Sequence, residues 1–354
     1  MKNLQSNRPA TAIEAHSDVR ALEMTAMHNS LRNDGGAKHH ANAKLHVKGM
    51  TAVATIALAI FLALVPAYAD TTQQQVFPTP EAAGKALVAA AEADDLKTLG
   101  SILGQDAADI LSSGDPVADN NSREEFVRRY HQMHRYAYDD DGRVILYIGA
   151  ANWPTPIPLI KQDGGWVFDT AAGKNELLYR RIGKNEMFTI NVLHDLAAAQ
   201  DEYSALKNQY AQKILSDPDQ QNGLFWQSPA GQPESPIGPL VASAQSEGYK
   251  RGENNAPIPF HGYYYRVLTM QGKGAHGGAM RYIVDGKMTR GFAFLAYPAD
   301  YRSSGVMTFM VNQDGVVVQK DLGPKTQELA SKMTEFNPNK TWDEVLPPAA
   351  GAGD

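Results

Sequence analysis

His131 and His134, in the segment RRYHQMHRY, are spaced so that they could bind a metal ion. Residues at i and i+3 share one face of a helix, so the two imidazoles could reach one ion, and the acidic run at residues 139–141 could add oxygen ligands. The zinc signature H-E-x-x-H differs, because its histidines are at i and i+4 and a glutamate follows the first. We therefore expect a solvated helix face that runs into an acidic turn, with His131 and His134 as candidate metal ligands only.

The segment QGKGAHGGAM, at residues 271–280, has four glycines around Lys273 and could in principle enclose a phosphate group. Neither GxGxxG at the start of a helix nor GxxxxGK[ST] can be read from it. It also lies between two predicted strands, whereas phosphate loops lead into a helix. We therefore expect a flexible hairpin loop and no cofactor.

No residue is assigned a catalytic role. The Gly-x-Ser-x-Gly pentapeptide of serine hydrolases does not occur in the chain. Glu176 and Glu186 could act as an acid and a base, but their separation in the sequence gives no geometry. His194 is expected to pack beside the apolar side of a long helix. It is one of five histidines after residue 69, namely His131, His134, His194, His261 and His276.

The first elements along the chain are predicted helices. Pro80 opens the first, and residues 96–103 form the second. The third begins at Ser122 as N-cap, with Glu125 three residues later as the other half of a capping box. These helices precede the strands, and that order is typical of α+β proteins.

Strands follow after residue 142. The run RVILYIGA predicts a buried strand, and two further strands join through Asp163-Gly164-Gly165. We therefore expect a first α+β domain at residues 77–180. The order of its elements resembles the cystatin-like and nuclear-transport-factor-2-like folds, in which a small curled antiparallel sheet wraps a helix.

A long amphipathic helix is predicted from residue 185 to residue 215, after a short charged linker at residues 180–184. Its apolar side consists of residues at spacings of three and four, among them Leu193, Leu196 and Tyr203. The charged residues on either side of them therefore form a solvated helix face and not an active site.

The rest of the chain is predicted to form an antiparallel sheet. Residues 216–260 are rich in Pro, Gly, Asn and Gln and contain one short helix, at 240–247. Strands dominate from residue 261, and the long helix is expected to pack on the sheet of residues 261–320. Helix and sheet together would form a second domain at residues 185–345, followed by a flexible tail at 346–354.

Tyr263, Tyr265, Tyr297 and Tyr301 form the candidate partner surface of this sheet. Alternate residues of a strand point to opposite faces, so about half of the aromatic side chains must point away from one core. Exposed tyrosines can mark a binding surface for a protein or a sugar polymer. A second layer that covers this face would explain them equally well.

The N-terminal segment has the order of a secretory signal. An uncharged apolar run at residues 50–65 follows basic residues and ends in Ala67-Tyr68-Ala69. We expect cleavage between Ala69 and Asp70, a disordered leader at residues 1–49 that reflects an upstream start codon, and a polar tether at 70–76. The alternative is an uncleaved inner-membrane anchor at residues 50–65.

Charge and cysteine content exclude several classes of function. Without residues 1–69 the chain has 26 basic and 35 acidic side chains, a net charge of −9. Such a surface disfavours nucleic acid and anionic membrane as partners. The chain has no cysteine, which excludes disulfides, thiolate metal sites and a cysteine nucleophile.

Long ordered segments resemble an uncharacterised family of exported bacterial proteins, the domain of unknown function 2950 family. They include NWPTPIPLI, WVFDTAAGKNELLYRRIGKNE, FHGYYYRVLTMQG and SGVMTFMVNQDGVVVQKDLG, and they lie between residues 77 and 345. The resemblance implies export to the periplasm but no activity and no catalytic residues. The turn at residues 302–305 departs from the tighter turn expected there.

The C-terminal half also resembles the globular heads of type IV pilin-like proteins. The similarity lies in a helix that begins with Asn-Glu and continues through Ala-Gln-x-x-Tyr, and in the segments GYYYRVL and FAFLAYPADY. In those heads a long helix packs lengthwise on an antiparallel sheet. The apolar membrane half of a pilin stem does not precede residue 185, so the resemblance does not extend to filament assembly.

These features predict an exported periplasmic or secreted protein with a non-enzymatic role, either binding or structural support in the cell envelope. Its partner would be an envelope protein or a polysaccharide. The alternatives are an envelope hydrolase that acts on cell-wall or polysaccharide material, and a pilin-like assembly or secretion factor. An enzyme would require a deep pocket where acids, or an acid and a histidine, converge, whereas a binding protein would require an exposed aromatic or apolar patch.

Overall fold

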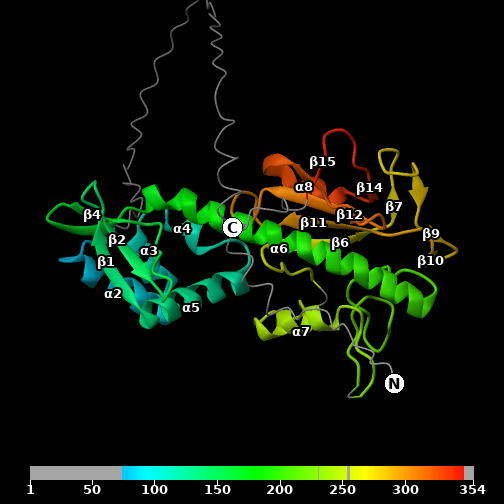
Figure 1. The fold of residues 1–354 in the computed structure, drawn as a ribbon, viewed down its shortest axis with the longest axis horizontal. Coiled ribbons are helices and arrows are strands. Elements are labelled where there is room, and N and C mark those ends of the chain that lie inside the picture. Colours follow the sequence, from blue (N-terminus) through cyan, green and yellow to red (C-terminus); the bar gives the residue numbers. More distant parts are fainter. Residues whose placement is uncertain (1–73, 230, 253–255, 347–354) are drawn as a thin grey trace, which may run out of the picture. The chain divides into compact units, whose positions relative to one another are not determined.

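Residues 74–229, 231–252 and 256–346 are described by the computed structural model (Figure 1). The predicted leader, signal segment, cleavage position and anchor, together with nearly all of the C-terminal tail, lie outside these residues. The described chain combines helices with antiparallel sheets, so the predicted α+β class is confirmed.

Within the residues that the structure describes, four helices precede the first sheet. They are α2 (Pro80–Glu92), α3 (Leu96–Leu103), α4 (Ala107–Leu111) and α5 (Pro116–Gln132). The predicted bounds of α3 are confirmed, and the side chain of Asp95 caps its first turn.

The predicted start of the third helix at Ser122 is wrong. Helix α5 begins at Pro116, with Asp115 as its N-cap. Ser122 lies inside the helix and donates its hydroxyl to the carbonyl of Ala118, while Glu125 pairs with arginines one turn later. Asp115-Pro116 is the stronger start signal, because proline at the first helical position needs no hydrogen-bond acceptor.

The first sheet is antiparallel and packs one face on these helices. Its strands are β1 (His134–Tyr138), β2 (Val144–Ile148), β3 (Trp153–Pro154), β4 (Leu159–Gln162) and β5 (Gly165–Phe168). Their order is β1-β2-β4-β5, with β3 also paired to β2. Burial alternates along β2, so one of its faces lies in the core and the other points outward. The core of this part includes Ile102, Val144, Leu159 and Phe168.

Residues 74–76 are not a free tether. The side-chain amide of Gln74 donates to the carbonyls of Ile102 and Phe168 at 3.0 and 2.7 Å. The backbone N–H of Gln75 donates to Ser101 at 2.9 Å. The polar composition suggested a tether, but these polar groups satisfy carbonyls of the folded part.

Helix α6 (Thr170–Lys207) is longer and begins earlier than predicted. Residues 180–184, predicted as a linker, lie inside it, and so does the whole charged segment around them. The carboxylate of Asp169 caps its start, and Asn208 ends it in the left-handed conformation, so the predicted extension to residue 215 is also wrong. The predicted apolar side is confirmed, since Leu193, Leu196 and Tyr203 are buried.

The second large sheet is antiparallel and has the order β15-β13-β12-β11-β6. Its strands are β6 (Tyr263–Leu268), β11 (Ala293–Pro298), β12 (Met307–Asn312), β13 (Val318–Asp321) and β15 (Asp343–Glu344). Helix α6 contacts β11 and β12, so the predicted packing of the long helix on this sheet is confirmed (Figure 1).

Smaller elements surround this sheet. They are α7 (Gly238–Ser246), β7 (Met270–Gln271), β8 (Met280–Arg281), β9 (Ile283–Val284), β10 (Lys287–Met288), the 3-10 helix η2 (Gly323–Lys325), α8 (Thr326–Lys332) and β14 (Glu335–Phe336). Helix α8 contacts β11, and every residue of β11 is buried. This central strand is therefore covered on both faces, by α6 and by α8.

Two large hydrophobic clusters fill the described chain, one within residues 77–168 and one within residues 192–336. Residues 72–349 nevertheless form one compact unit, and α6 runs through the boundary that we predicted at 180–185. The division into two domains stays a prediction. None of the helices in the described part combines the length and apolar composition that a membrane span needs.

Candidate functional site

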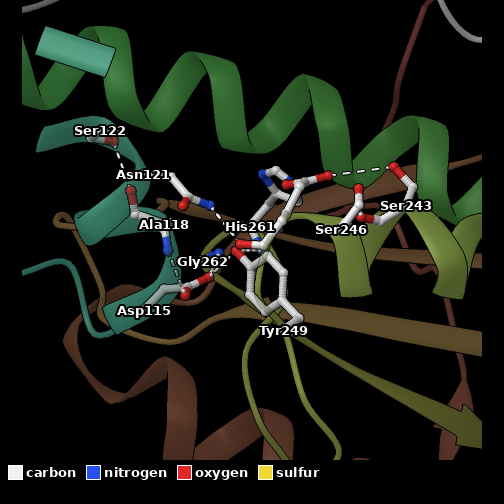
Figure 2. Close-up of polar contacts among 10 residues, drawn as sticks. Asp115, Ala118, Asn121, Ser122, Ser243, Ser246, Tyr249, His261 and Gly262 are labelled. Atoms are coloured by element: carbon white, nitrogen blue, oxygen red, sulfur yellow. Dashed lines mark hydrogen bonds and ion pairs between the residues drawn. The ribbon is translucent and has the colours of Figure 1, made fainter. Parts of the chain in front are cut away.

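A buried polar cluster lies where the start of α5, the end of α7 and the start of β6 meet (Figure 2). We call it the junction cluster, and it consists of Asp115, Glu247, Tyr249, His261 and Gly262. These residues are up to 147 positions apart in the sequence, so the fold alone brings them together.

Asp115 is the centre of the junction cluster. Only 1% of its surface is exposed, yet both carboxylate oxygens have partners. Oδ1 accepts the backbone N–H of Ala118 at 3.1 Å, which caps α5. Oδ2 accepts the hydroxyl of Tyr249 at 2.9 Å and the backbone N–H of Gly262 at 2.8 Å (Figure 2). Buried polar groups need hydrogen-bond partners, and the three donors to Asp115 come from three segments, so Asp115 fastens these segments together.

Tyr249 connects this carboxylate to the histidine. Its hydroxyl donates to Asp115, and the hydroxyl oxygen accepts the backbone N–H of His261 at 3.1 Å. Burial, followed by the negative charge of Asp115, raises the pKa of Tyr249 well above its ordinary value. Tyr249 therefore stays protonated and serves as a fixed donor, not as an acid.

His261 and Glu247 form the acid and histidine pair of the cluster. Nε2 of His261 lies 2.8 Å from Oε2 of Glu247, at an angle outside that of a good hydrogen bond. The imidazole also packs on the ring of Phe188 from α6, with 3.8 Å between ring centroids. Burial alone would raise the pKa of Glu247, but His261 outweighs it and holds this pKa below its usual range.

A second polar contact region fixes α6 to the loop between β11 and β12. Asn185 donates its side-chain amide to the carbonyl of Ser304 at 2.9 Å. Oε1 of Glu186 accepts the backbone N–H groups of Val306 and Met307, both at 2.9 Å. Burial raises the pKa of Glu186 above its ordinary value although these two N–H groups oppose the shift.

Both polar regions direct their donors and acceptors toward other parts of the chain. Neither contributes a residue to either of two hollows on the surface of the described chain. One hollow, of about 340 Å³, lies between α2 and α5 and is lined by Glu92, Asp94 and Glu124 among others. The other, of about 290 Å³, is lined by residues that include Asp300, Tyr301 and Thr326. The polar groups of both regions thus fix segments of the chain to one another.

The candidate metal ligands His131 and His134 lie in different elements. His131 is in α5 and pairs through Nε2 with Glu92 of α2. His134 begins β1, and its ring stacks on Tyr130 with 3.9 Å between centroids. In the part of the chain that the structure describes, no three potential metal-ligating residues gather around one point.

The tyrosines of the candidate partner surface on the second sheet are largely covered. Tyr263 is fully buried and Tyr297 is 7% exposed, while the hydroxyl of Tyr265 donates to Thr189 of α6 at 3.2 Å. Tyr301 is half-buried and bonds Asp321. The reason is the two-sided cover of this sheet, which the sequence pattern left open.

The other residues that we considered from the sequence lie apart from one another in the structure. His194 is exposed, although we expected it to pack beside the apolar side of α6. Glu176 pairs with Arg180 one turn along the same helix, ten residues before the half-buried Glu186. The glycine-containing loop is ordered by Gln271, whose amide donates to the carbonyls of His276 and Gly278. The structure thus does not bring these residues into one site.

Exposed large aromatic side chains occur instead within residues 138–179. Tyr138, Tyr179 and Trp153 have 71%, 58% and 39% of their surface exposed. Trp153 carries the guanidinium of Arg180 over its ring, at 5.0 Å from the centroid. These aromatic residues come from β1, β3 and α6, and we did not single out any of them from the sequence.

The outward face of the first sheet carries a preordered arginine. The guanidinium of Arg135 lies over the ring of Tyr147 at 3.9 Å, and its Nε donates to Oδ1 of Asn152 at 2.6 Å. Among the described residues, no carboxylate pairs with Arg135. Because a guanidinium has five N–H donors, four remain for a partner, held in a fixed plane.

Sequence reasoning missed most of the junction cluster. The Asp115-Pro116 dipeptide is a helix-start signal and could have identified Asp115 as a cap. Nothing local marks Tyr249 or His261, because their partners come from distant segments. Arg135 could have been noticed as a charge in a predicted strand, but its pairing with Tyr147 depends on the register of β1 and β2.

A family model described as a protein of unknown function, DUF2950, matches residues 74–345. This match covers most of the chain, and it includes both polar regions and the outward face of the first sheet. No curated protein and no solved structure matches the chain. The resemblance to pilin heads and to cystatin-like folds therefore remains a likeness of element order.

Proposed function

The chain belongs to the DUF2950 family of proteins of unknown function, and from that premise we propose that it is an exported cell-envelope protein that binds another envelope protein. The outward face of the first sheet, centred on Arg135, Tyr147 and Asn152, is the binding surface. The secretory pattern at residues 50–69 supports export to the periplasm.

The preordered guanidinium of Arg135 is the observation that carries this proposal. Stacking on Tyr147 and the bond to Asn152 fix its orientation before any partner arrives, so little side-chain entropy is lost on binding. Arginine and tyrosine are enriched at protein interfaces and often supply most of the binding energy. The partner would present a carboxylate, because a guanidinium pairs with that group through two parallel hydrogen bonds.

The surroundings of Arg135 favour a protein surface as the partner. Ile145 and Tyr147 alternate with the buried residues of β2, so an apolar strip lies beside the charge. Strand β1, which carries Arg135, is the outer strand in the order of its sheet. An outer strand can pair with an extended segment of another protein.

Photo-crosslinking tests this proposal. A photoreactive residue at Ile145 in the full chain, produced in its native envelope, should give a discrete protein adduct. Arg135→Glu should reduce this adduct by roughly tenfold or more, since hydrogen bonds to charged groups contribute about 1.5–3 kcal/mol. Arg128→Glu is the matched control, because Arg128 is exposed and already pairs with Glu125 on α5.

Three outcomes would contradict the proposal. They are an adduct that persists in Arg135→Glu, an adduct lost equally in Arg128→Glu, and crosslinking to polysaccharide alone. A photoreactive residue at Leu329, which is exposed on α8, shows how much adduct arises at any exposed position.

A further inference from the structure

His261 is held in an unusual position at the start of β6. Its backbone has φ of +48°, in the left-handed region that is uncommon for residues other than glycine, although Asn, Asp and His are enriched there. Its side chain is 16% exposed, and that of its partner Glu247 is 30% exposed. The fold thus accepts local backbone strain where the histidine meets a partly buried carboxylate.

Charged or titratable side chains from four segments lie in or act on the junction cluster. Glu247, at the C-cap of α7, contacts the imidazole itself, and Tyr249 accepts the backbone N–H of His261. Asp115, the N-cap of α5, accepts the backbone N–H of Gly262, and Lys184 of α6 acts on Glu247 through its charge. Asp115 is already engaged by three donors, and Tyr249 stays protonated. Glu247 is therefore the group whose interaction with the ring depends most on the charge of the ring.

The contact between His261 and Glu247 has one strong state and one weak state. A protonated imidazole makes an ion pair with the carboxylate at 2.8 Å. A neutral imidazole makes only a polar contact, because the angle is outside hydrogen-bond geometry. Histidine is the side chain that changes its charge between about pH 5 and 8.

We propose that His261 and Glu247 form a pH-dependent clamp that fastens the end of α7 to the start of β6. The backbone carbonyl of Glu247 also accepts the side-chain amide of Asn121 at 3.0 Å, so the clamp holds α7 to α5 as well (Figure 2). In mildly acidic medium the clamp is closed, and near pH 8 it is weakened.

The sign of the effect follows from the order in which the two groups titrate. Glu247 has a lowered pKa and keeps its charge well into the acidic range. Histidine, in contrast, is the type of side chain whose charge changes between about pH 5 and 8. The ion pair is therefore complete at the acidic end of this range and is lost as the pH rises through it. At still lower pH it is lost again, when Glu247 takes up a proton.

Hydrogen exchange of the amides in residues 238–249 tests the clamp on the full chain. After correction for the intrinsic rate, protection at pH 5.5 should exceed protection at pH 7.5 by roughly fivefold, the effect of one partly buried ion pair. His261→Asn, which tolerates the left-handed backbone, and Glu247→Gln should each remove this difference. His276→Asn should keep it, since the His276 side chain is 93% exposed.

Equal protection of this segment at the two pH values would overturn the clamp. So would a difference that persists in both His261→Asn and Glu247→Gln. Glu247→Gln alone decides the matter if His261→Asn does not fold, because it replaces one oxygen and leaves the backbone at residue 261 unchanged. None of these outcomes depends on the proposed binding surface, which lies on β1 and β2 and shares no residue with the clamp.

Discussion

Glu186 shows how one half-buried side chain can hold a loop at a free-energy cost that depends on pH. Its Oε1 satisfies two backbone N–H groups, and its burial raises its pKa. The folded chain therefore binds the proton of Glu186 more tightly than the unfolded chain does. The contribution of this group to stability falls as the pH rises from the unfolded pKa, about 4.3, through the raised folded value.

Two substitutions separate the charge of Glu186 from its role as acceptor. Glu186→Gln keeps an acceptor oxygen but cannot ionise. The free energy of unfolding of this variant should therefore not show the decrease between pH 4 and neutrality that the ionisation of Glu186 causes. Glu186→Ala leaves the N–H groups of Val306 and Met307 unpaired and should lower the free energy of unfolding by about 1–3 kcal/mol. Urea unfolding at several pH values measures both, and a Gln variant as unstable as the Ala variant would contradict the assignment.

At the residue scale, local sequence predicts caps but not partners. Asp95 and Asp115 precede helices, and their role could be predicted from residue type and position. The bonds of Asp115 to Tyr249 and Gly262 span 134 and 147 residues, and no local pattern encodes them. The exposure of the tyrosines in the second sheet could not be predicted either. The residue pattern of a strand does not show whether other elements cover one face of the sheet or both.

At the element scale, the continuity of α6 through residues 180–184 makes a matched glycine test possible. A Cβ at Gly173 would lie 2.5 Å from the carbonyl oxygen of Pro156, whereas a Cβ at Gly183 would meet nothing within 4 Å. Gly183→Ala should stabilise by about 0.5–1 kcal/mol through helix propensity. Gly173→Ala should destabilise by about 1–3 kcal/mol through overpacking.

The predicted linker and the observed helix give different results in this test. If residues 180–184 were a linker, Gly183→Ala would bring no helical gain. Thermal unfolding of both variants measures the difference, and a neutral Gly183→Ala would contradict the continuous helix. The first half of α6 packs on the first core and on α4. Its apolar residues therefore follow a different face of the helix from those after residue 192, and the sequence pattern placed the start of α6 too late.

At the scale of the whole molecule, the remaining question is where the chain works. The apolar run at residues 50–65 and the Ala67-Tyr68-Ala69 ending predict cleavage after Ala69. The chain from Asp70 onward has no cysteine, so its fold forms equally well in an oxidising compartment. Such a chain can be exported without the need for disulfide formation.

N-terminal sequencing of the protein from fractionated cells tests export directly. The protein recovered from the envelope or periplasm should begin at Asp70. Ala67→Arg should leave a longer form at the membrane, because small residues are required at both alanine positions of the cleavage site. Ala52→Ser, a small change at the start of the apolar run, is the control and should leave processing intact. Recovery of a cytoplasmic protein that retains residues before Met50 would contradict export. An envelope protein could then no longer be the partner that binds Arg135.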